Sequence, residues 1–134
     1  MEEHRERVVS VVDDDESVRR SVRNLLLSAG FRAAVFESAE SFLQSAQRAS
    51  TGCLVVDLRM PGMDGLDLLA HLRKAGECVP AVILTAHDDD DARERARQIG
   101  AVAFLDKPFQ CAELIEAVES ALLRGQGSVS VGDK

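Results

Sequence analysis

The sequence predicts an α/β protein in which a parallel sheet lies between two layers of helices. Two observations lead to this fold class. Short runs rich in β-branched residues alternate with stretches of helical period along the chain, and Gly, Pro or Asp residues close each run. Such alternation is typical of βαβ units, whose crossover helices make the sheet parallel. The length of 134 residues fits a single domain of this kind.

The first two predicted strands flank a helix. Val8 to Val12 is almost wholly apolar, as expected of a strand buried on both faces, and Asp13 ends it. From Glu16 onward, apolar residues recur every three or four positions, which predicts a helix that stops at Gly30. Arg32 to Phe36 has the composition of a second strand.

A short helix and a turn are predicted next. Ser38 is a suitable N-cap for a helix that carries Phe42, Leu43 and Ala46. Residues 48–52 are expected to form the turn that leads into the third strand.

The middle of the chain contains two further strands around a helix. Cys53 to Val56 is the most strand-like run, and Asp57 ends it. The segment 60–65 contains Pro and Gly and predicts a structured loop. A helix marked by leucines at helical spacing then runs to Gly76, followed by a strand from Ala81 to Thr85.

The last two helices surround a short fifth strand. A fourth helix is predicted to begin within 88–91, with Ala96 and Ile99 as its buried positions, and its weak apolar pattern indicates a mobile element. Ala103 to Leu105 is the fifth strand. The final helix carries Ile115, Val118 and Leu122 at spacings of three and four.

These patterns divide the chain into three parts. Residues 1–7 form a charged leader, residues 8–124 form the folded domain, and residues 125–134 are a Gly/Ser-rich stretch expected to be a flexible tail or linker. No segment has the apolar character of a signal peptide or a membrane span, so a soluble cytoplasmic protein is expected.

Composition excludes several classes of function. Lys and Arg number 16 against 23 Asp and Glu, and the net charge of −7 argues against direct binding to nucleic acid by these residues. Three cysteines without a C-x-x-C spacing indicate neither a disulfide framework nor a zinc site. No glycine-rich phosphate-binding motif is present, and His4 and His71 have no partner at metal-ligand spacing.

Chemistry-bearing residues follow four of the five predicted strands. They are Asp13 and Asp14, Asp57, Thr85, and Lys107. Ligands of open parallel sheets bind outside the carboxyl ends of the strands, so these side chains are expected to converge there. Taken singly, each has an ordinary structural explanation as a turn residue, a strand threonine or a surface lysine, and only their joint position favours a site.

The predicted site suits a divalent cation and a phosphoryl group. Clustered carboxylates repel one another unless a cation bridges them, and oxygen donors favour Mg²⁺. Aspartate is also a known covalent acceptor of phosphoryl groups. Asp57 is therefore predicted as the nucleophile, Asp13 and Asp14 as metal-holding residues, Lys107 as the cation that neutralises phosphoryl oxygens, and Thr85 as a hydrogen-bond donor.

Four separated segments form a recognisable set of motifs. They read VVDDDE at 11–16, VVDLRMPGMDG at 55–65, LTAH at 84–87 and LDKPF at 105–109. Together they resemble the receiver domain of bacterial two-component response regulators. The resemblance covers Val8 to Arg124 and is most similar to FixJ-type receivers, whose full-length proteins continue into a DNA-binding domain. It implies a flavodoxin-like sheet of order 2-1-3-4-5, a three-layer sandwich, and a cis peptide bond between Lys107 and Pro108.

The resemblance also implies a function for each site residue. Asp57 would receive a phosphoryl group from the phosphohistidine of a sensor histidine kinase or phosphotransfer protein. Asp14 and Asp57 with the backbone carbonyl of Arg59 would bind Mg²⁺, and Asp13 would act through metal-bound water. Thr85 and Lys107 match the switch positions of the family.

The output implied by the family is a change of surface. Phe104 stands at the switch aromatic position, where Tyr is commoner and would supply a hydroxyl. Phosphorylation would alter the face made by the fourth helix, the fifth strand and the last helix, with homodimerisation as a consequence. Arg59 and His87 would set the lifetime of the phosphoryl group.

Other functions remain open at this stage. The chain could be a receiver alone or the receiver part of a longer FixJ-type transcriptional regulator. An aspartyl-phosphate phosphatase would share the nucleophile and the metal, but Arg59 stands where such enzymes carry a second aspartate. A flavin-binding protein would need a neutral phosphate loop where Asp13, Asp14 and Asp15 stand.

Overall fold

The strands form one parallel sheet, as the sequence predicts. The computed structural model describes residues 7–86 and 90–132. Its strands are β1 (Val8–Val12), β2 (Arg32–Phe36), β3 (Thr51–Asp57), β4 (Ala81–Thr85) and β5 (Ala103–Asp106). All neighbouring pairs are parallel and the order is β2-β1-β3-β4-β5, which confirms the expected flavodoxin-like topology.

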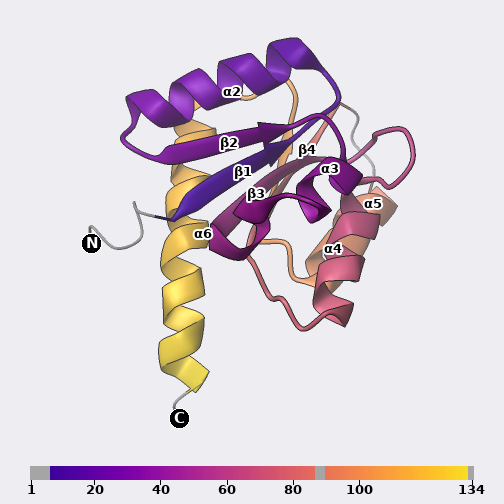
Figure 1. Cartoon of the computed structure of the whole chain (residues 1–134), viewed down its shortest axis with the longest axis vertical. Coiled ribbons are helices and arrows are strands. Elements are labelled where there is room, and N and C mark those ends of the chain that lie inside the picture. Colours follow the sequence, from indigo (N-terminus) through magenta and orange to yellow (C-terminus); the bar gives the residue numbers. More distant parts are fainter. Residues whose placement is uncertain (1–6, 87–89, 133–134) are drawn as a thin grey trace.

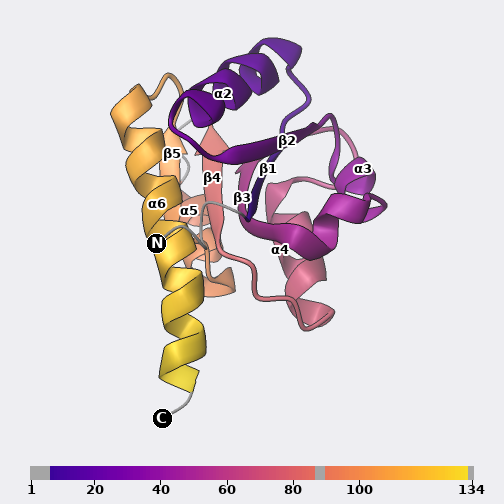
Figure 2. The same ribbon diagram turned by 60° about the vertical axis from the view of Figure 1, so that its left-hand side comes forward.

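Helices cover both faces of this sheet and complete the three-layer sandwich. They are α2 (Glu16–Ser28), α3 (Ala39–Leu43), α4 (Gly65–Lys74), α5 (Asp90–Ile99) and α6 (Cys111–Gly132), with a 3-10 turn η1 (Ala46–Ser50). Helices α2 and α6 pack on one face and α3, α4 and α5 on the other (Figure 1). In Figure 2 the sheet is seen between α2 and α6 on the left and α3 and α4 on the right.

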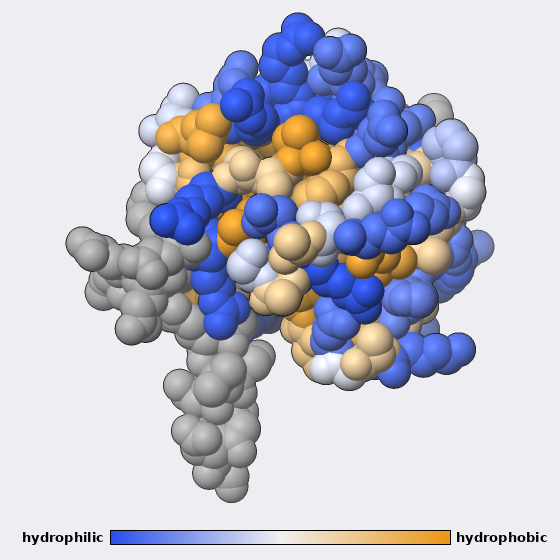
Figure 3. Space-filling view, viewed as in Figure 1, coloured by the Kyte–Doolittle hydropathy of each residue, from blue (hydrophilic) through white to orange (hydrophobic). Residues whose placement is uncertain are grey.

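Alternation along the strands divides the core into two halves. Val9 and Val11 of β1 join the half under α2 and α6, whereas Val12 joins the half under α4. Leu54 and Val55 alternate in the same way on β3. Because both halves are apolar, the central strands are buried on both sides, which explains why their sequences read as continuous hydrophobic runs. The outer surface in Figure 3 is mostly hydrophilic, with apolar residues in small separate patches.

The turn predicted at residues 48–52 is wrong at both ends. The 3-10 turn η1 occupies Ala46–Ser50, so Ala46 does not belong to the preceding helix, and β3 begins at Thr51 rather than at Cys53. Hydrogen bonds of the Thr51 hydroxyl explain the earlier start. It donates to the Gln47 carbonyl at 2.7 Å and accepts from the buried Ser10 hydroxyl at 2.7 Å, which ties it to β1.

The start of α4 also differs from the prediction. Gly65, expected in the loop, is the first residue of α4. Asp64 and Asp67 form a reciprocal capping box, in which each side chain accepts from the other residue's backbone N–H. The box satisfies two amide donors of the first turn and therefore lets the helix begin at a glycine.

Helix α6 extends beyond the predicted end of the domain. The sequence ends this helix at Arg124, but the structure continues it to Gly132, through most of the stretch assigned to a flexible tail. The physical reason is that extending a nucleated helix costs far less than starting one, so glycines and serines can follow a well-packed segment. The division into leader, domain and linker stays a prediction. No helix within the described parts of the chain is long and apolar enough for a membrane crossing.

Replacing Leu69 with Ala tests the core under α4. Leu69 is fully buried, and its truncation is expected to lower the free energy of unfolding by about 2–5 kcal/mol. Urea denaturation measures the change. The matched control is Leu27→Ala on α2, whose side chain is 45% exposed and whose truncation is expected to change stability by less than about 0.5 kcal/mol. Equal losses in the two variants would contradict this account of the core.

Candidate functional site

Three carboxylates meet at the carboxyl edge of the sheet. Asp13 and Asp14 directly follow β1, and Asp57 is the last residue of β3. The two strands are neighbours and pair Val12 with Val56, which brings the residues after them side by side. Oxygen atoms of Asp13, Asp14 and Asp57 lie within 4.8 Å of one another. The three aspartates therefore converge, as the sequence predicts.

Lys107 links two of these carboxylates. Its Nζ lies 3.1 Å from Asp13 Oδ2 and 3.4 Å from Asp57 Oδ1. The Lys107 amide donates to the Thr85 carbonyl at 2.6 Å, which places its backbone beside the end of β4. The bond to Pro108 is cis, as expected. Burial lowers the pKa of Lys107, but the hydrogen bond and charge of Asp13 and the charge of Asp57 outweigh it and raise the pKa overall. Lys107 is thus a permanent cation.

Asp13 is the most buried of the three carboxylates, and hydrogen bonds fix its position. It is fully buried. Its Oδ1 accepts from the Asp15 amide at 2.9 Å, and its backbone carbonyl accepts from Arg19 Nη1 at 2.8 Å. Asp15 in turn caps α2 through bonds from Ser17 and the following residue. Asp14, by contrast, is exposed at the rim. The Asp13 carboxylate is therefore buried and fixed, whereas the Asp14 carboxylate is accessible to an incoming ligand.

The charged form of the Asp57 carboxylate is destabilised in this arrangement. The residue is only 7% exposed. Burial and the charge of Asp13 raise its pKa to about 6, although the Lys107 ammonium opposes the shift and Asp14 adds to it. A carboxylate with such a pKa is poorly solvated and poorly neutralised, so protonation or a bound cation that offsets its charge is favourable there.

The donor set fits a hard divalent cation. Three carboxylates face one lysine, which leaves two negative charges uncompensated when all are ionised. Oxygen ligands at this density suit Mg²⁺, which binds through one or two carboxylates and keeps several waters. The set contains no thiol or imidazole among the described residues, so a soft metal is disfavoured.

The loop after Asp57 approaches the site closely because of a glycine. A Cβ on Gly65 would lie 2.6 Å from the Asp57 carbonyl oxygen and 3.2 Å from Leu58 Cα. The Gly65 amide donates to the Leu58 carbonyl at 3.1 Å, which closes the loop. Sequence reasoning missed this function of Gly65, because the need for a small residue is visible only once α4 is packed against β3.

Two further residues that the sequence did not single out support the site. Arg19 holds the Asp13 carbonyl, and Glu40 on α3 accepts from the Met63 amide at 3.3 Å beside Gly62, whose φ is +77°. Glu40 and Met63 are far apart in the sequence, and no sequence pattern pairs Arg19 with Asp13.

The remaining predicted residues lie around this cluster. Thr85 ends β4 and is 1% exposed, and Arg59 is exposed in the loop after β3. Phe104 on β5 is half-buried, with the Arg93 guanidinium 4.5 Å from its ring centre. His87, expected to influence phosphoryl lifetime, lies outside the described residues.

Comparison with known proteins decides the family. The model of the response regulator receiver domain matches residues 9–119. This chain belongs to the receiver domain family. The match covers β2 to β5, all of β1 except Val8, and every residue of the carboxylate cluster.

Individual relatives agree and are of the FixJ type. The chain is 40% identical over 118 residues to the transcriptional regulatory protein FixJ of Bradyrhizobium diazoefficiens, covering 88% of this chain and 58% of FixJ. It is 44% identical over 117 residues to nodulation protein W of the same organism, covering 87% and 52%. The crystal structure of FixJ-N is similar with a TM-score of 0.80 and 40% identity, covering 87% of this chain and 93% of that one. The chain thus spans about half the length of the curated relatives it matches.

Replacing Asp57 with Asn tests the electrostatics of the cluster through pH. The ordinary Asp pKa of 3.8 rises to about 6 in the folded protein, so between these values the folded state holds the proton more tightly than the unfolded state. The stability that this proton contributes is present below pH 4 and is lost as the pH rises through 6. Asp57→Asn is therefore expected to stabilise the domain on the order of 2 kcal/mol at pH 7.5 and far less at pH 4.

Urea unfolding in EDTA at the two pH values measures this difference. The control is Asp91→Asn, an exposed carboxylate in the first turn of α5, which is expected to have nearly the same effect at both. A stability gain from Asp57→Asn that does not depend on pH would show that Asp57 has an ordinary pKa.

Proposed function

We propose that this domain is a phosphorylation switch in which Asp57 accepts a phosphoryl group from a phosphohistidine of a sensor histidine kinase or phosphotransfer protein. The observation that carries the proposal is a nearly buried carboxylate with raised pKa, 3.4 Å from a lysine ammonium and grouped with two further carboxylates. Family membership supports it, because histidine kinases and phosphotransfer proteins are the partners of receiver domains.

The proposed reaction moves one phosphoryl group. A carboxylate oxygen of Asp57 forms a bond to phosphorus while the phosphorus–nitrogen bond to the donor histidine breaks, and the imidazole leaves with the bonding electrons. Lys107 pairs with the phosphoryl oxygens as the carboxylate charge of Asp57 is used up. Bound Mg²⁺, held by Asp14, Asp57 and the Arg59 carbonyl with Asp13 acting through water, would supply further neutralisation of those oxygens.

The switch is proposed to run from Asp57 to the face of α5, β5 and α6. Thr85 would turn toward the phosphoryl group, and Phe104 would follow it inward. Arg93 covers the Phe104 ring and also pairs with Asp106 at 3.5 Å, so an inward ring would free this arginine from one of its partners. Altered exposure of this face would change its affinity for another protein, with a second copy of the chain as a candidate partner.

We propose a transcriptional output for the parent protein. The segments that match this chain make up 58% of FixJ and 52% of nodulation protein W, and the name of the former states a transcriptional regulatory function. A DNA-binding domain after α6 would supply the positive charge that these residues lack. In this proposal the site modifies its own aspartate and has no external substrate. The proposed location of the protein is the cytoplasm.

Treatment with acetyl phosphate and Mg²⁺ tests the phosphoacceptor. Intact mass spectrometry is expected to show the addition of one phosphoryl group to the wild type, and none to Asp57→Asn or in the presence of EDTA. The substitution removes the nucleophilic carboxylate, and EDTA removes the cation. Asp91→Asn serves as the control for a lost carboxylate and is expected to be modified like the wild type.

Two results would overturn the proposal. One is an unmodified wild type under these conditions, and the other is equal modification of Asp57→Asn. Turnover of p-nitrophenyl phosphate by the wild type would instead favour the phosphatase alternative.

Replacing Arg59 with Ala tests control of the phosphoryl lifetime. The exposed guanidinium lies two residues from Asp57, where its charge and bulk would stabilise the phosphoryl oxygens and hinder water. Arg59→Ala is expected to speed decay of the phosphorylated form by about two- to tenfold, as the loss of one such interaction implies. Decay is followed by mass spectrometry after donor removal, with Arg95→Ala on α5 as the control; an unchanged lifetime would exclude this function of Arg59.

A further inference from the structure

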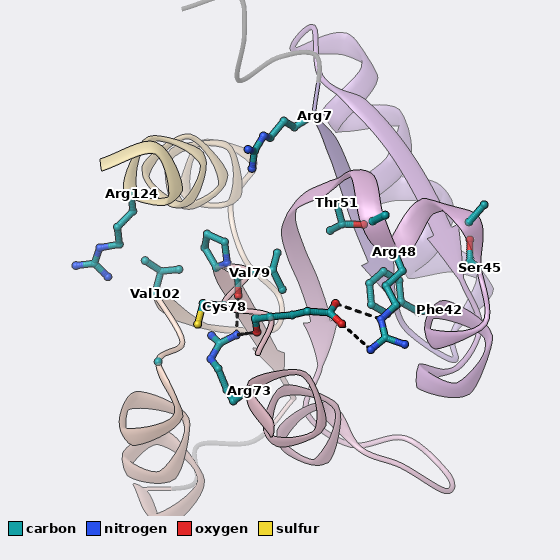
Figure 4. Close-up of a pocket in the computed structure, with 15 residues that line it drawn as sticks. Arg7, Phe42, Ser45, Arg48, Thr51, Arg73, Cys78, Val79, Val102 and Arg124 are labelled. Atoms are coloured by element: carbon teal, nitrogen blue, oxygen red, sulfur yellow. Dashed lines mark hydrogen bonds and ion pairs between the residues drawn. The ribbon is translucent and has the colours of Figure 1, made fainter. Parts of the chain in front are cut away.

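A cavity lies at the edge of the sheet opposite to Asp57. It has a volume of about 790 Å³, within the range of small-molecule sites. Residues near the amino ends of β1, β3, β4 and β5 line it, together with residues of α4 and α6 (Figure 4). Its position makes it independent of the phosphorylation site and of the function proposed above.

Positive charge is concentrated in this cavity although the chain as a whole is acidic. Among the described residues, four arginines line it, namely Arg7, Arg48, Arg73 and Arg124, against one carboxylate, that of Glu77. Arg48 is already paired with Glu77, through Nη2 at 2.8 Å and Nε at 3.2 Å, as the dashed lines in Figure 4 show. The other three arginines have no carboxylate partner among the described residues.

Arg73 is fixed with one edge of its guanidinium unused. Its Nε donates to the Ile99 carbonyl at 3.0 Å, and its Nη1 donates to the carbonyls of Glu77 and Val79 at 3.1 Å each. These bonds hold the planar group but do not neutralise its charge, and burial lowers its pKa. Nη2 has no bonded partner within the described chain. An oxyanion bound there would need no reordering of the side chain.

Glycines make room for two of the arginines. A Cβ at Gly100 would lie 3.3 Å from Arg73 Nη2, and one at Gly52 would lie 2.6 Å from Arg7 Cδ. The missing side chains leave Arg73 Nη2 accessible and let the stem of Arg7 lie over β3. In Figure 4, Arg7 extends from the strand side toward α6, the helix that carries Arg124.

Part of the remaining lining is apolar. Val79 and Pro80 precede β4 and Val102 precedes β5, and all three are partly exposed. This combination of one fixed guanidinium, further exposed arginines and an apolar wall is complementary to an amphipathic anion. A simple inorganic ion would leave the wall uncovered, and a neutral apolar molecule would leave the arginines unpaired.

We propose that this cavity binds a small organic anion, with a carboxylate, sulfonate or phosphate group on Arg73 Nη2, an apolar body on Val79, Pro80 and Val102, and long-range attraction from the exposed arginines Arg7 and Arg124 at the rim. Binding adds a ligand input at the end of the domain from which α6 leads away (Figure 1). No covalent step is involved.

The probe for the test is 8-anilino-1-naphthalenesulfonate, an amphipathic anion, compared with the uncharged N-phenyl-1-naphthylamine. Fluorescence titration of the full chain is expected to show one site for the sulfonate and much weaker binding of the neutral compound. The double variant Arg7→Gln/Arg124→Gln is expected to bind the sulfonate about tenfold more weakly, since the attraction of two positive charges at the rim is lost. Arg23→Gln/Arg95→Gln, two exposed arginines outside the cavity, removes the same charge and is expected to bind like the wild type.

Cysteine alkylation locates the bound probe. Cys78 is exposed and lines the cavity, whereas Cys111 is exposed outside it and serves as an internal control. Saturating sulfonate is expected to slow the reaction of Cys78 with iodoacetamide and to leave Cys111 unchanged. Equal protection of both cysteines, protection of neither, or equal affinity of the two double variants would overturn the proposal. Asp57→Asn is expected to bind the probe normally, so failure of the phosphorylation proposal would leave this result intact.

Discussion

The ammonium of Lys107, shared between Asp13 and Asp57, is the interaction on which the rest of the site depends. Without it, two nearly buried carboxylates would face each other at a distance where like charges repel strongly. The lysine reduces this repulsion without removing it, since the pKa of Asp57 stays near 6. The cluster therefore stays short of positive charge, which makes it receptive to a divalent cation.

The parallel sheet brings these groups together and also separates two chemistries. All carboxyl ends lie on one edge and carry the acidic cluster, while the amino ends lie on the other and carry the arginine-lined cavity. A net charge of −7 hides this polarity. Charge is thus distributed by topology, so that an anion-accepting and a cation-accepting site share one small domain without neutralising each other.

Local patterns were sufficient for most of the fold. Strands buried on both faces are continuous apolar runs, which the sequence shows directly. A cap such as Ser38 acts within the three residues that follow it, so it can also be predicted from the sequence. The errors lie where long-range contacts override local preference. Thr51 extends β3 because Ser10 lies beside it, and α6 extends past Arg124 through backbone bonds that composition does not disclose. Gly65 was missed because its crowding against the Asp57 carbonyl exists only in the packed structure.

By itself the sequence determined which residues could carry chemistry and that they stand at strand ends, because strand ends and residue types are local properties. It also determined the family, through four separated motifs. The tertiary structure alone decided the distances among Asp13, Asp57 and Lys107, and with them the raised pKa of Asp57, because desolvation and Coulomb energy depend on three-dimensional separation. It alone revealed the cavity of Arg7, Arg73 and Arg124, whose residues have no shared pattern along the chain.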